Sequence, residues 1–207
     1  MINMMTDPKS DQTAPPRQPI LWIDGVGGYL LIDRDEVCLG QAVSGSSVDV
    51  GVVGDLSRQA AVIRRVEVDY LLQPLQPATR LNGVPVDRAQ LLTGNDVIQF
   101  GQRLRLNFIK PNPLSATARL ELPAHGRFQP HVDAVLLLGD SCILGPAPGS
   151  HVLCPEWQSE LLLLRRGKGW VFRTLEKLDV NGQAEQGQIA MVPGLRIRGE
   201  DFSLSIE

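Results

Sequence analysis

The feature that most constrains the fold of this chain is a pattern of short apolar segments and turn residues that occurs twice in the same order. The matched segments are residues 37–40 and 142–145, 61–65 and 162–166, 81–83 and 180–182, and 101–108 and 199–206. The offset between matched positions shrinks along the chain, from 105 residues at Gly40 and Gly145 to 98 at Gly101 and Gly199. A duplicated module with shorter loops in its second copy predicts this trend, because surface loops tolerate deletion better than strands do. Chance similarity between β segments, which share composition, is the alternative explanation.

Both halves consist of apolar stretches of about 4 to 8 residues separated by Gly, Pro and Asp, which is typical of β-strands. In residues 104–108 the apolar side chains of Leu104, Leu106 and Phe108 alternate with polar ones. This alternation places one side of a strand on a core and the other side in water. No stretch sustains the period of an amphipathic helix for long. The sequence therefore predicts an all-β fold.

The predicted organisation is two tandem β-sandwiches preceded by a disordered arm. Residues 1–18 form the arm, since they are mostly polar and contain paired prolines. Residues 19–112 and 113–207 form the two sandwiches. The boundary falls in the stretch 110–115, where two prolines withhold the backbone donors that a sheet requires.

Two Asn-Gly pairs predict tight hairpins at matching places in the two halves. A two-residue type I′ turn needs a positive φ at both central positions, which asparagine and glycine tolerate. Two further glycines follow β-type residues and are predicted to start turns. The predicted structural turn positions are Gly40, Asn82, Gly83, Gly145, Asn181 and Gly182.

Charge and cysteine content limit the classes of partner. The formal net charge is −3 and the pI is about 5.6, which argues against duplex nucleic acid or an anionic membrane surface as the main partner. No apolar run approaches the ~20 residues that span a bilayer. The three cysteines, Cys38, Cys142 and Cys154, lack disulfide or zinc spacing, so we expect buried, reduced thiols. We expect a cytoplasmic protein.

Four segments of the first half, taken in order, resemble the forkhead-associated (FHA) family, whose β-sandwiches typically bind phosphothreonine peptides. Residues 39–41 stand where the family has a Gly-Arg pair, and residues 55–63 look like its Ser-Arg-x-His-Ala-x-Ile stretch. Residues 81–86 look like its closing hairpin, and residues 92–101 like its Leu-x-x-Gly-Asp-x-Ile-x-x-Gly signature. The resemblance covers residues 20–110 and implies a peptide-binding β-sandwich.

The resemblance implies a ligand-binding set in the loops of the first half. Its members are Gln41, Ser57, Arg58 and Thr79. Gln41 replaces the family's arginine, Ala60 its histidine, and Pro77 lies where an asparagine is expected. An amide lacks the forked positive charge that holds a phosphate, so these replacements argue against the usual phosphothreonine mode.

The second half keeps the scaffold of the resemblance and loses its ligand-reading residues. Pro146 stands at the arginine position, and residues 157–161 replace the Ser-Arg-x-His stretch. Glu160 would repel a phosphate. This half is predicted to serve packing or dimerisation.

Enzymatic, metal and cofactor sites are not predicted. Gly139-Asp140-Ser141 is similar to a hydrolase nucleophile block, but no histidine base follows His151. His125, His131 and His151 have no metal-ligand spacing and are predicted to be solvated.

Two functions remain from the sequence. The first is an FHA-like interaction module that binds a protein partner, phosphorylated or not. The second is a purely structural or assembly protein without a peptide site. The arginine pairs 64–65 and 165–166 are predicted to be solvated strand ends, with flanks for an acidic partner as the alternative.

Overall fold

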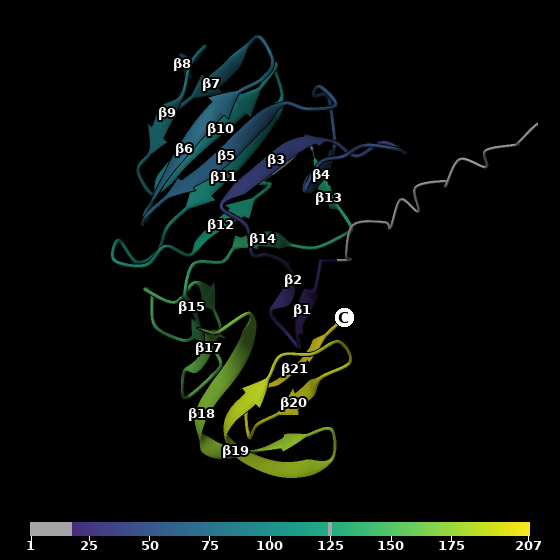
Figure 1. Ribbon diagram of the computed structural model, residues 1–207, viewed down its shortest axis with the longest axis vertical. Coiled ribbons are helices and arrows are strands. Elements are labelled where there is room, and N and C mark those ends of the chain that lie inside the picture. Colours follow the sequence, from purple (N-terminus) through teal and green to yellow (C-terminus); the bar gives the residue numbers. More distant parts are fainter. Residues whose placement is uncertain (1–17, 124–125) are drawn as a thin grey trace, which may run out of the picture.

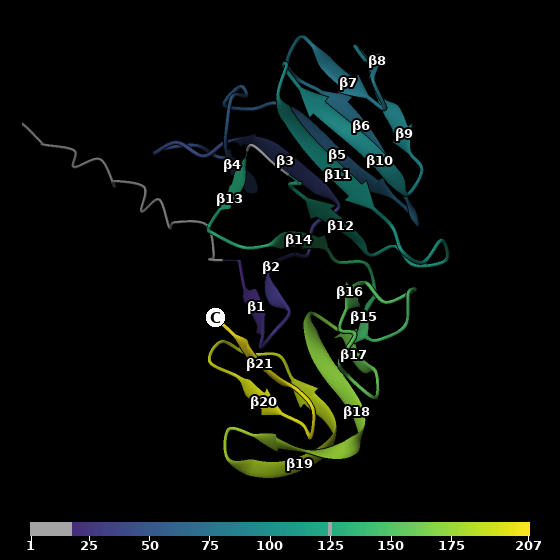
Figure 2. The same cartoon turned by 180° about the vertical axis from the view of Figure 1, so that it is seen from behind.

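The computed structural model describes residues 18–123 and 126–207, so the predicted arm, apart from Gln18, lies outside the described residues. Within these two ranges the chain is all-β, with two sheets and no helix. Figure 1 shows two lobes stacked along the long axis of the molecule, and Figure 2 shows the same stacking from behind. No helix in the described ranges is long and apolar enough to cross a membrane.

The smaller sheet belongs to the upper lobe of Figure 1. Its strands are β3 (Glu36–Gln41), β4 (Val50–Val53), β5 (Ala61–Val66), β6 (Asp69–Pro74), β9 (Gln90–Leu92) and β13 (Arg127–Gln129). They lie in the order β13-β4-β3-β5-β6-β9.

The larger sheet runs through both lobes. Its strands are β1 (Ile20–Ile23), β2 (Gly27–Ile32), β7 (Thr79–Leu81), β8 (Val84–Pro85), β10 (Asn95–Phe100), β11 (Leu104–Ile109), β12 (Ala118–Glu121), β14 (Ala134–Leu137), β15 (Ser141–Gly145), β16 (Val152–Leu153), β17 (Leu161–Arg166), β18 (Gly169–Val180), β19 (Gln183–Ala190), β20 (Arg196–Arg198) and β21 (Ser203–Ile206). The order is β16-β15-β17-β18-β20-β21-β1-β2-β14-β12-β11-β10-β7-β8, and β19 pairs with β18.

The repeat in the sequence corresponds to a repeat in strand pairing. In the first half β3 pairs parallel with β4 and antiparallel with β5, which continues into β6. In the second half β15 pairs parallel with β16 and antiparallel with β17, which continues into β18. Leu39 lies opposite Ala61, and Leu144 lies opposite Leu161. β5 and β17 are therefore equivalent strands, and their first residues are equivalent positions.

This register corrects the match between the arginine pairs. Arg65 lies opposite Tyr70, and Arg165 lies opposite Trp170, so Arg65 corresponds to Arg165. The predicted match of Arg65 with Arg166 is wrong by one residue. The four consecutive leucines of β17 show no alternation from which the sequence could fix the register, and a slip of one residue reverses every side chain.

The Asn-Gly pairs occupy equivalent hairpins with the backbone that a type I′ turn requires. The φ angles are 52° and 81° at Asn82 and Gly83, and 51° and 86° at Asn181 and Gly182. In both hairpins the asparagine Oδ1 accepts a hydrogen bond, at 2.9 Å, from the backbone N–H of the residue 15 positions further along. The asparagine thus ties its turn to the next strand of the sheet.

Each half lends a hairpin to the sheet of the other half. The N-terminal hairpin β1–β2 pairs with β21 at the C-terminal end, where Leu21 lies opposite Ile206. The pair β12 and β14 joins β11 of the first half, where Leu120 lies opposite Phe108. Parallel pairing of β2 with β14 joins the two hairpins in the middle of the larger sheet. The order of the strands in the larger sheet therefore differs from their order along the chain.

Two hydrophobic cores lie on opposite faces of these middle strands. Leu30 and Val135 contribute to the core of the first half, which also contains Phe108. Leu31 and Leu136 contribute to the core of the second half. Strands covered on both faces need apolar side chains at successive positions, which explains the unbroken apolar runs in β2 and β14.

Candidate functional site

Three loops of the first half meet at one end of β3, and we call them the rim. The rim consists of residues 42–49, 54–60 and 75–78, which follow β3, β4 and β6. It contains or adjoins all four side chains of the predicted ligand-binding set. These side chains are therefore close in space although they are up to 38 positions apart, from Gln41 to Thr79.

Hydrogen bonds connect three members of the predicted set. The backbone N–H of Gln41 donates to the carbonyl oxygen of Ser57 at 3.0 Å. The backbone N–H of Ser57 donates to Oε1 of Gln76 at 2.7 Å, and Oγ1 of Thr79 donates to the carbonyl oxygen of Gln76 at 3.0 Å. Gln76 is thus the bridge of the rim. The sequence motifs gave no signal for it, because it lies in a loop outside every matched segment.

The four predicted side chains differ in what they can offer a ligand. Thr79 is 1% exposed, so it supports the rim from beneath. Gln41 is half-buried, and its Nε2 donates to the carbonyl oxygen of Gly54 at 3.4 Å. Ser57 and Arg58 are exposed. Ser57 and Arg58 are therefore the two side chains of this set that a ligand can contact.

Arg58 lies beside an open groove of about 410 Å³. The lining residues are Gly45, Ser46, Ser47, Ser57, Arg58 and Gln59, and the arginine is the charged one among them. Its guanidinium makes no hydrogen bond or ion pair with any residue that the structure describes. A guanidinium bordered by hydroxyl and amide groups is suited to binding a carboxylate or a phosphate.

Gly40 fixes the backbone that carries Arg58. The predicted turn glycines Gly40 and Gly145 in fact lie at the ends of strands β3 and β15, and close approach of another segment is what requires them. A Cβ at Gly40 would overlap the carbonyl oxygen of Arg58. A Cβ at Gly145 would lie 2.8 Å from Cγ of Glu160. The rim is therefore packed directly onto β3.

The equivalent place in the second half is filled. Trp157 stands four residues before β17, as Ser57 stands four residues before β5. The indole of Trp157 is 5% exposed and stacks on Phe202, with ring centroids 4.3 Å apart and an interplanar angle of 25°. An aromatic stack thus occupies the position that corresponds to the exposed serine of the rim.

The position that corresponds to Arg58 also lacks a cation in the second half. Gln158 occupies it, and the backbone N–H of Gln158 donates to Oδ2 of Asp201. The two halves share a scaffold, but at these equivalent positions the first half has an open groove beside an arginine and the second half has a stacked tryptophan and a glutamine.

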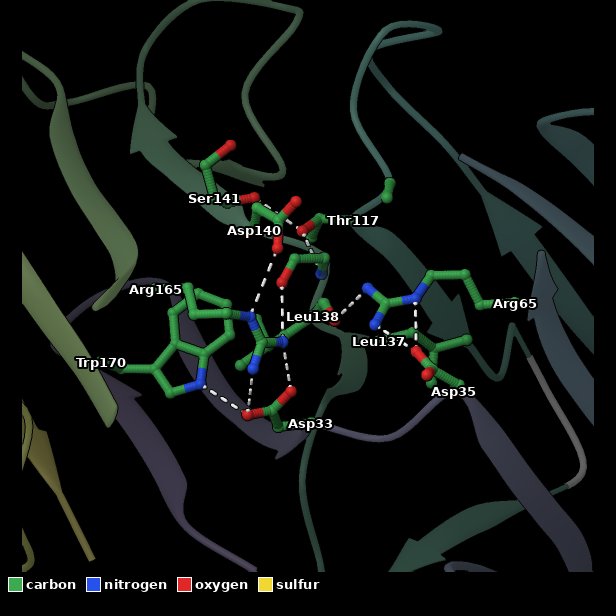
Figure 3. Close-up of polar contacts among 12 residues, drawn as sticks. Asp33, Asp35, Arg65, Thr117, Leu137, Leu138, Asp140, Ser141, Arg165 and Trp170 are labelled. Atoms are coloured by element: carbon green, nitrogen blue, oxygen red, sulfur yellow. Dashed lines mark hydrogen bonds and ion pairs between the residues drawn. The ribbon is translucent and has the colours of Figure 1, made fainter. Parts of the chain in front are cut away.

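A second polar cluster lies where the chain passes between the halves (Figure 3). We call it the junction, and it comprises residues 33–35 and 138–140 with the arginines that bind them. Arg165 donates to both carboxylate oxygens of Asp33 and, at 3.0 Å, to the carbonyl oxygen of Gly139. Its guanidinium carbon lies 4.7 Å from the ring centre of Trp170, whose Nε1 donates to Asp33 at 2.9 Å. One arginine thus joins both passing segments.

Arg65 occupies the equivalent place in the first half. It donates to the carboxylate of Asp35 and, through Nη1, to the carbonyl oxygen of Leu138 at 2.8 Å. The backbone N–H groups of Arg65 and Arg165 donate to the carbonyl oxygens of Asp35 and Asp140. The side chains of Arg65 and Arg165 are 14% and 28% exposed, so the prediction of solvated strand ends is wrong for these two, whereas Arg64 and Arg166 are exposed as predicted. Their hydrogen bonds lie within the chain.

The junction shifts the pKa of its acidic and basic groups in the directions that favour the ion pair. Burial opposes ionisation of Asp33, but hydrogen bonds from Arg165 and Trp170 outweigh it and hold the pKa of this carboxyl below its ordinary value. The hydrogen bond to Asp33 raises the pKa of Arg165. The pair is therefore charged at neutral pH.

His151 is a structural residue. It is 0% exposed, its Nδ1 accepts the backbone N–H of Ile143 at 2.9 Å, and its Nε2 lies 2.9 Å from Oγ of Ser115. Burial, reinforced by Arg119, lowers the pKa of His151 from 6.5 to about 4. The prediction of a solvated side chain is wrong for His151, whereas His131 is exposed and His125 lies outside the described residues.

The nucleophile-like block does not form a catalytic group with His151, because both imidazole nitrogens have other neighbours. Ser141 lies in β15, and its carbonyl oxygen accepts a hydrogen bond from Thr117 at 2.6 Å. The described part of the chain contains no cluster of three or more potential metal ligands. Burial raises the pKa of the Cys142 and Cys154 thiols to about 12 and about 11, and that of the half-buried Cys38 thiol as well.

Comparison with protein-family models finds no matching family, and comparison with curated proteins finds no similar one.

The rim, its counterpart in the second half and the junction differ in how accessible they are to a ligand. The rim of the first half is open, its counterpart in the second half is filled, and the junction is hydrogen-bonded internally.

Proposed function

We propose that the chain is a protein-interaction module of FHA-like type, in which the rim of the first half binds a segment of a partner protein. The observation that carries this proposal is Arg58, an exposed guanidinium beside an open groove without a partner among the described residues. The order of FHA-like segments in residues 39–101 supports the same location.

The segment that we expect to bind presents a phosphate or a carboxylate to Arg58. Ser57 and the serines of the loop 42–49 supply neutral donors around that charge. Gln41 and Ala60 are uncharged, so neither adds a second positive group; the amide of Gln41 is hydrogen-bonded to Gly54, and Ala60 is 0% exposed. One arginine holds a phosphate more weakly than two arginines would. We therefore do not expect strict selection of phosphothreonine.

The alternative function is a purely structural or assembly protein. The filled counterpart of the rim in the second half favours it, because a scaffold can persist without a ligand site. In this alternative the rim is an ordinary loop cluster, and Arg58 has no ligand.

An array of phosphothreonine peptides and their unphosphorylated counterparts, presented to the full chain, separates the two functions. We expect specific binding that Arg58→Ala weakens by roughly 10-fold to 100-fold, the range for one charge-assisted contact. Ser57→Ala weakens it less. Arg173→Ala is the matched control, since Arg173 is an exposed arginine on β18 of the second half.

Thermal melting of each variant verifies that the chain remains folded. Uniform absence of binding by a folded sample, or binding that Arg58→Ala leaves unchanged, overturns the rim as the site. The first result supports the structural alternative.

A further inference from the structure

The outer face of the second half carries two rows of polar side chains that the strand register places side by side. In one row Asp179 of β18 lies opposite Arg198 of β20, which lies opposite Ser203 of β21. The neighbouring residues Val180, Ile197 and Leu204 point into the core of the second half. Side chains alternate between the faces of a sheet, so the first row points outward.

The second row crosses β20, β21 and β1, two residues away from the first row along β20 and β21. Arg196 lies opposite Ser205, and Ser205 lies opposite Trp22 of β1. Arg196 and Arg198 therefore share a face at a spacing of about 7 Å, two residues of an extended strand. This face belongs to β20, β21 and β1, which lie together in the lower lobe of Figures 1 and 2.

These rows border two hollows that share lining residues. A hollow of about 790 Å³ contains both rows' arginines and serines together with Asp24, Asp179 and Asn181. A second hollow, of about 410 Å³, shares Gly194, Arg196 and Ser205 with the first and adds Trp22 and Pro193. The two form one groove, which we call the β20 groove.

Trp22 forms a fixed aromatic wall at one end of the β20 groove. Its Nε1 donates to Oε2 of Glu207 at 3.1 Å. A Cβ at Gly28 would overlap the indole ring, so the ring lies against the backbone of β2. The indole is half-buried and is packed against the core of the first half.

The two arginines of the groove are not required by the scaffold. β10 and β11 of the first half correspond to β20 and β21, and Ile98 corresponds to Ile197. Val97 and Gln99 therefore stand where the second half has Arg196 and Arg198. Both arginines are exposed, and neither makes a hydrogen bond or ion pair through its side chain to any of the described residues.

We infer that the β20 groove is a second binding surface, which takes an extended acidic segment of a partner polypeptide. Arg196 and Arg198 receive the carboxylates, and the hydroxyls of Ser203 and Ser205 donate to carboxylate or backbone oxygens. Trp22 receives an apolar side chain or a peptide plane.

The charges of the groove favour a polypeptide over other polyanions. Asp24 and Asp179 line the first hollow and Glu207 lines the second, and their carboxylates accept the backbone N–H groups that a peptide offers. The same carboxylates repel a nucleic acid or a sulfated polysaccharide, whose anionic groups are closely and regularly spaced along the chain.

The test uses the full chain and a capped decapeptide of alternating glutamate and serine, followed by intrinsic fluorescence. Trp157 and Trp170 are 5% and 6% exposed, so Trp22 is the indole that reports on the groove. The double variant Arg196→Val/Arg198→Gln carries the residues that the first half has at these positions and is expected to fold. We expect it to bind on the order of 10-fold to 100-fold more weakly, as loss of one or two charge-assisted contacts predicts.

Two control variants distinguish this groove from other basic surfaces. Arg173→Ala leaves the affinity unchanged, and in the Arg58→Ala background, which removes the cation of the rim, the double variant still lowers the affinity. Trp22→Phe abolishes the fluorescence change, while calorimetry shows that the peptide still binds. A decapeptide of alternating glutamine and serine binds at least about 10-fold more weakly than the glutamate peptide.

Three results overturn the inference. These are an affinity that the double variant does not lower, an equal loss in Arg173→Ala, and tighter binding of a single-stranded oligonucleotide or a heparin oligosaccharide than of the peptide.

Discussion

Arg165 and Asp33 form a two-pronged ion pair although 132 positions separate them in the chain. Asp33 directly follows β2, which belongs to the hairpin that extends the sheet of the second half. Arg165 lies on β17 of that same half. The pair therefore fastens the chain at the point where it leaves the second lobe to begin the first (Figure 3).

Asp33→Asn is expected to destabilise the fold by about 1 to 2 kcal/mol, because it removes a charged acceptor from a partly buried arginine. Asp35→Asn is the matched control. The side chain of Asp35 is 75% exposed, against 37% for Asp33, so we expect a loss of at most about 1 kcal/mol. Urea denaturation at pH 7 measures both values, and equal losses would show that the burial of the Asp33–Arg165 pair does not make it the stronger of the two.

The same pair predicts a dependence on acid pH. The pKa of Asp33 lies below its ordinary 3.8 in the folded chain, so its stabilising effect is present above pH 3.8 and is lost as the pH falls through the folded value. The difference in unfolding free energy between wild type and Asp33→Asn is expected to shrink below pH 3.8. A difference that stays constant down to pH 2.5 would show that the carboxylate charge is not the cause.

Cleavage between the halves is expected to leave them associated. A protease site inserted after Leu114, which is 90% exposed, allows cutting between β11 and β12. Each fragment then retains a hairpin that pairs with the other, and the middle strands keep Leu31 and Leu136 buried. The cut chain should elute as one species in native size-exclusion chromatography and as two in denaturant. Two folded fragments that separate without denaturant would argue for independent modules.

Local features of the fold were predictable, because they depend on neighbouring residues. The alternation in residues 104–108 predicted β11, and the Asn-Gly pairs predicted turns with positive φ. The hairpin exchange was not predictable from strand patterns alone, since alternation says which side of a strand is buried but not against which half. The unbroken apolar runs 29–32 and 134–138 were the available signal, because they indicate strands covered on both faces.

The candidate site was predictable only as a set of residues. Motif order grouped Gln41 with Ser57 and Arg58, and the structure places Gln41 at the end of β3 beside the loop that carries the other two, whereas Thr79 is buried beneath them. Gln76 holds the loops together through hydrogen bonds of its side chain and backbone. Such loop contacts depend on tertiary structure, for which the sequence carries no periodic signal.

His151 predicts a loss of stability in mild acid. Its pKa is about 4 in the folded chain and 6.5 ordinarily, so the unfolded chain binds the proton first as the pH falls. The free energy of unfolding is therefore unaffected by protonation of His151 above pH 6.5. Between pH 6.5 and about pH 4 it falls by roughly 3 kcal/mol, the amount that corresponds to this shift in pKa. His151→Asn keeps an acceptor for Ile143 without the titration, so its stability should vary less over this range.

Denaturation curves at half-unit pH intervals measure the effect of His151. His131→Asn, at an exposed position, is the control and should follow the wild type. If His151→Asn retains the full wild-type pH dependence, other groups are responsible.

Gly40→Ala is expected to damage the fold and the rim together. The added Cβ meets the carbonyl oxygen of Arg58, a backbone atom that cannot turn away, and we expect a loss of about 1 to 3 kcal/mol. Gly45→Ala is the control in the same rim: φ is +76° at Gly45 and nothing lies within 4 Å of its Cβ position, so only the backbone cost of about 1 kcal/mol applies. Thermal melting and the peptide array compare the two. Gly40→Ala displaces Arg58 and Gly45→Ala does not. Peptide binding by the folded fraction should therefore fall in Gly40→Ala and persist in Gly45→Ala. The opposite result would show that β3 does not hold Arg58 in place.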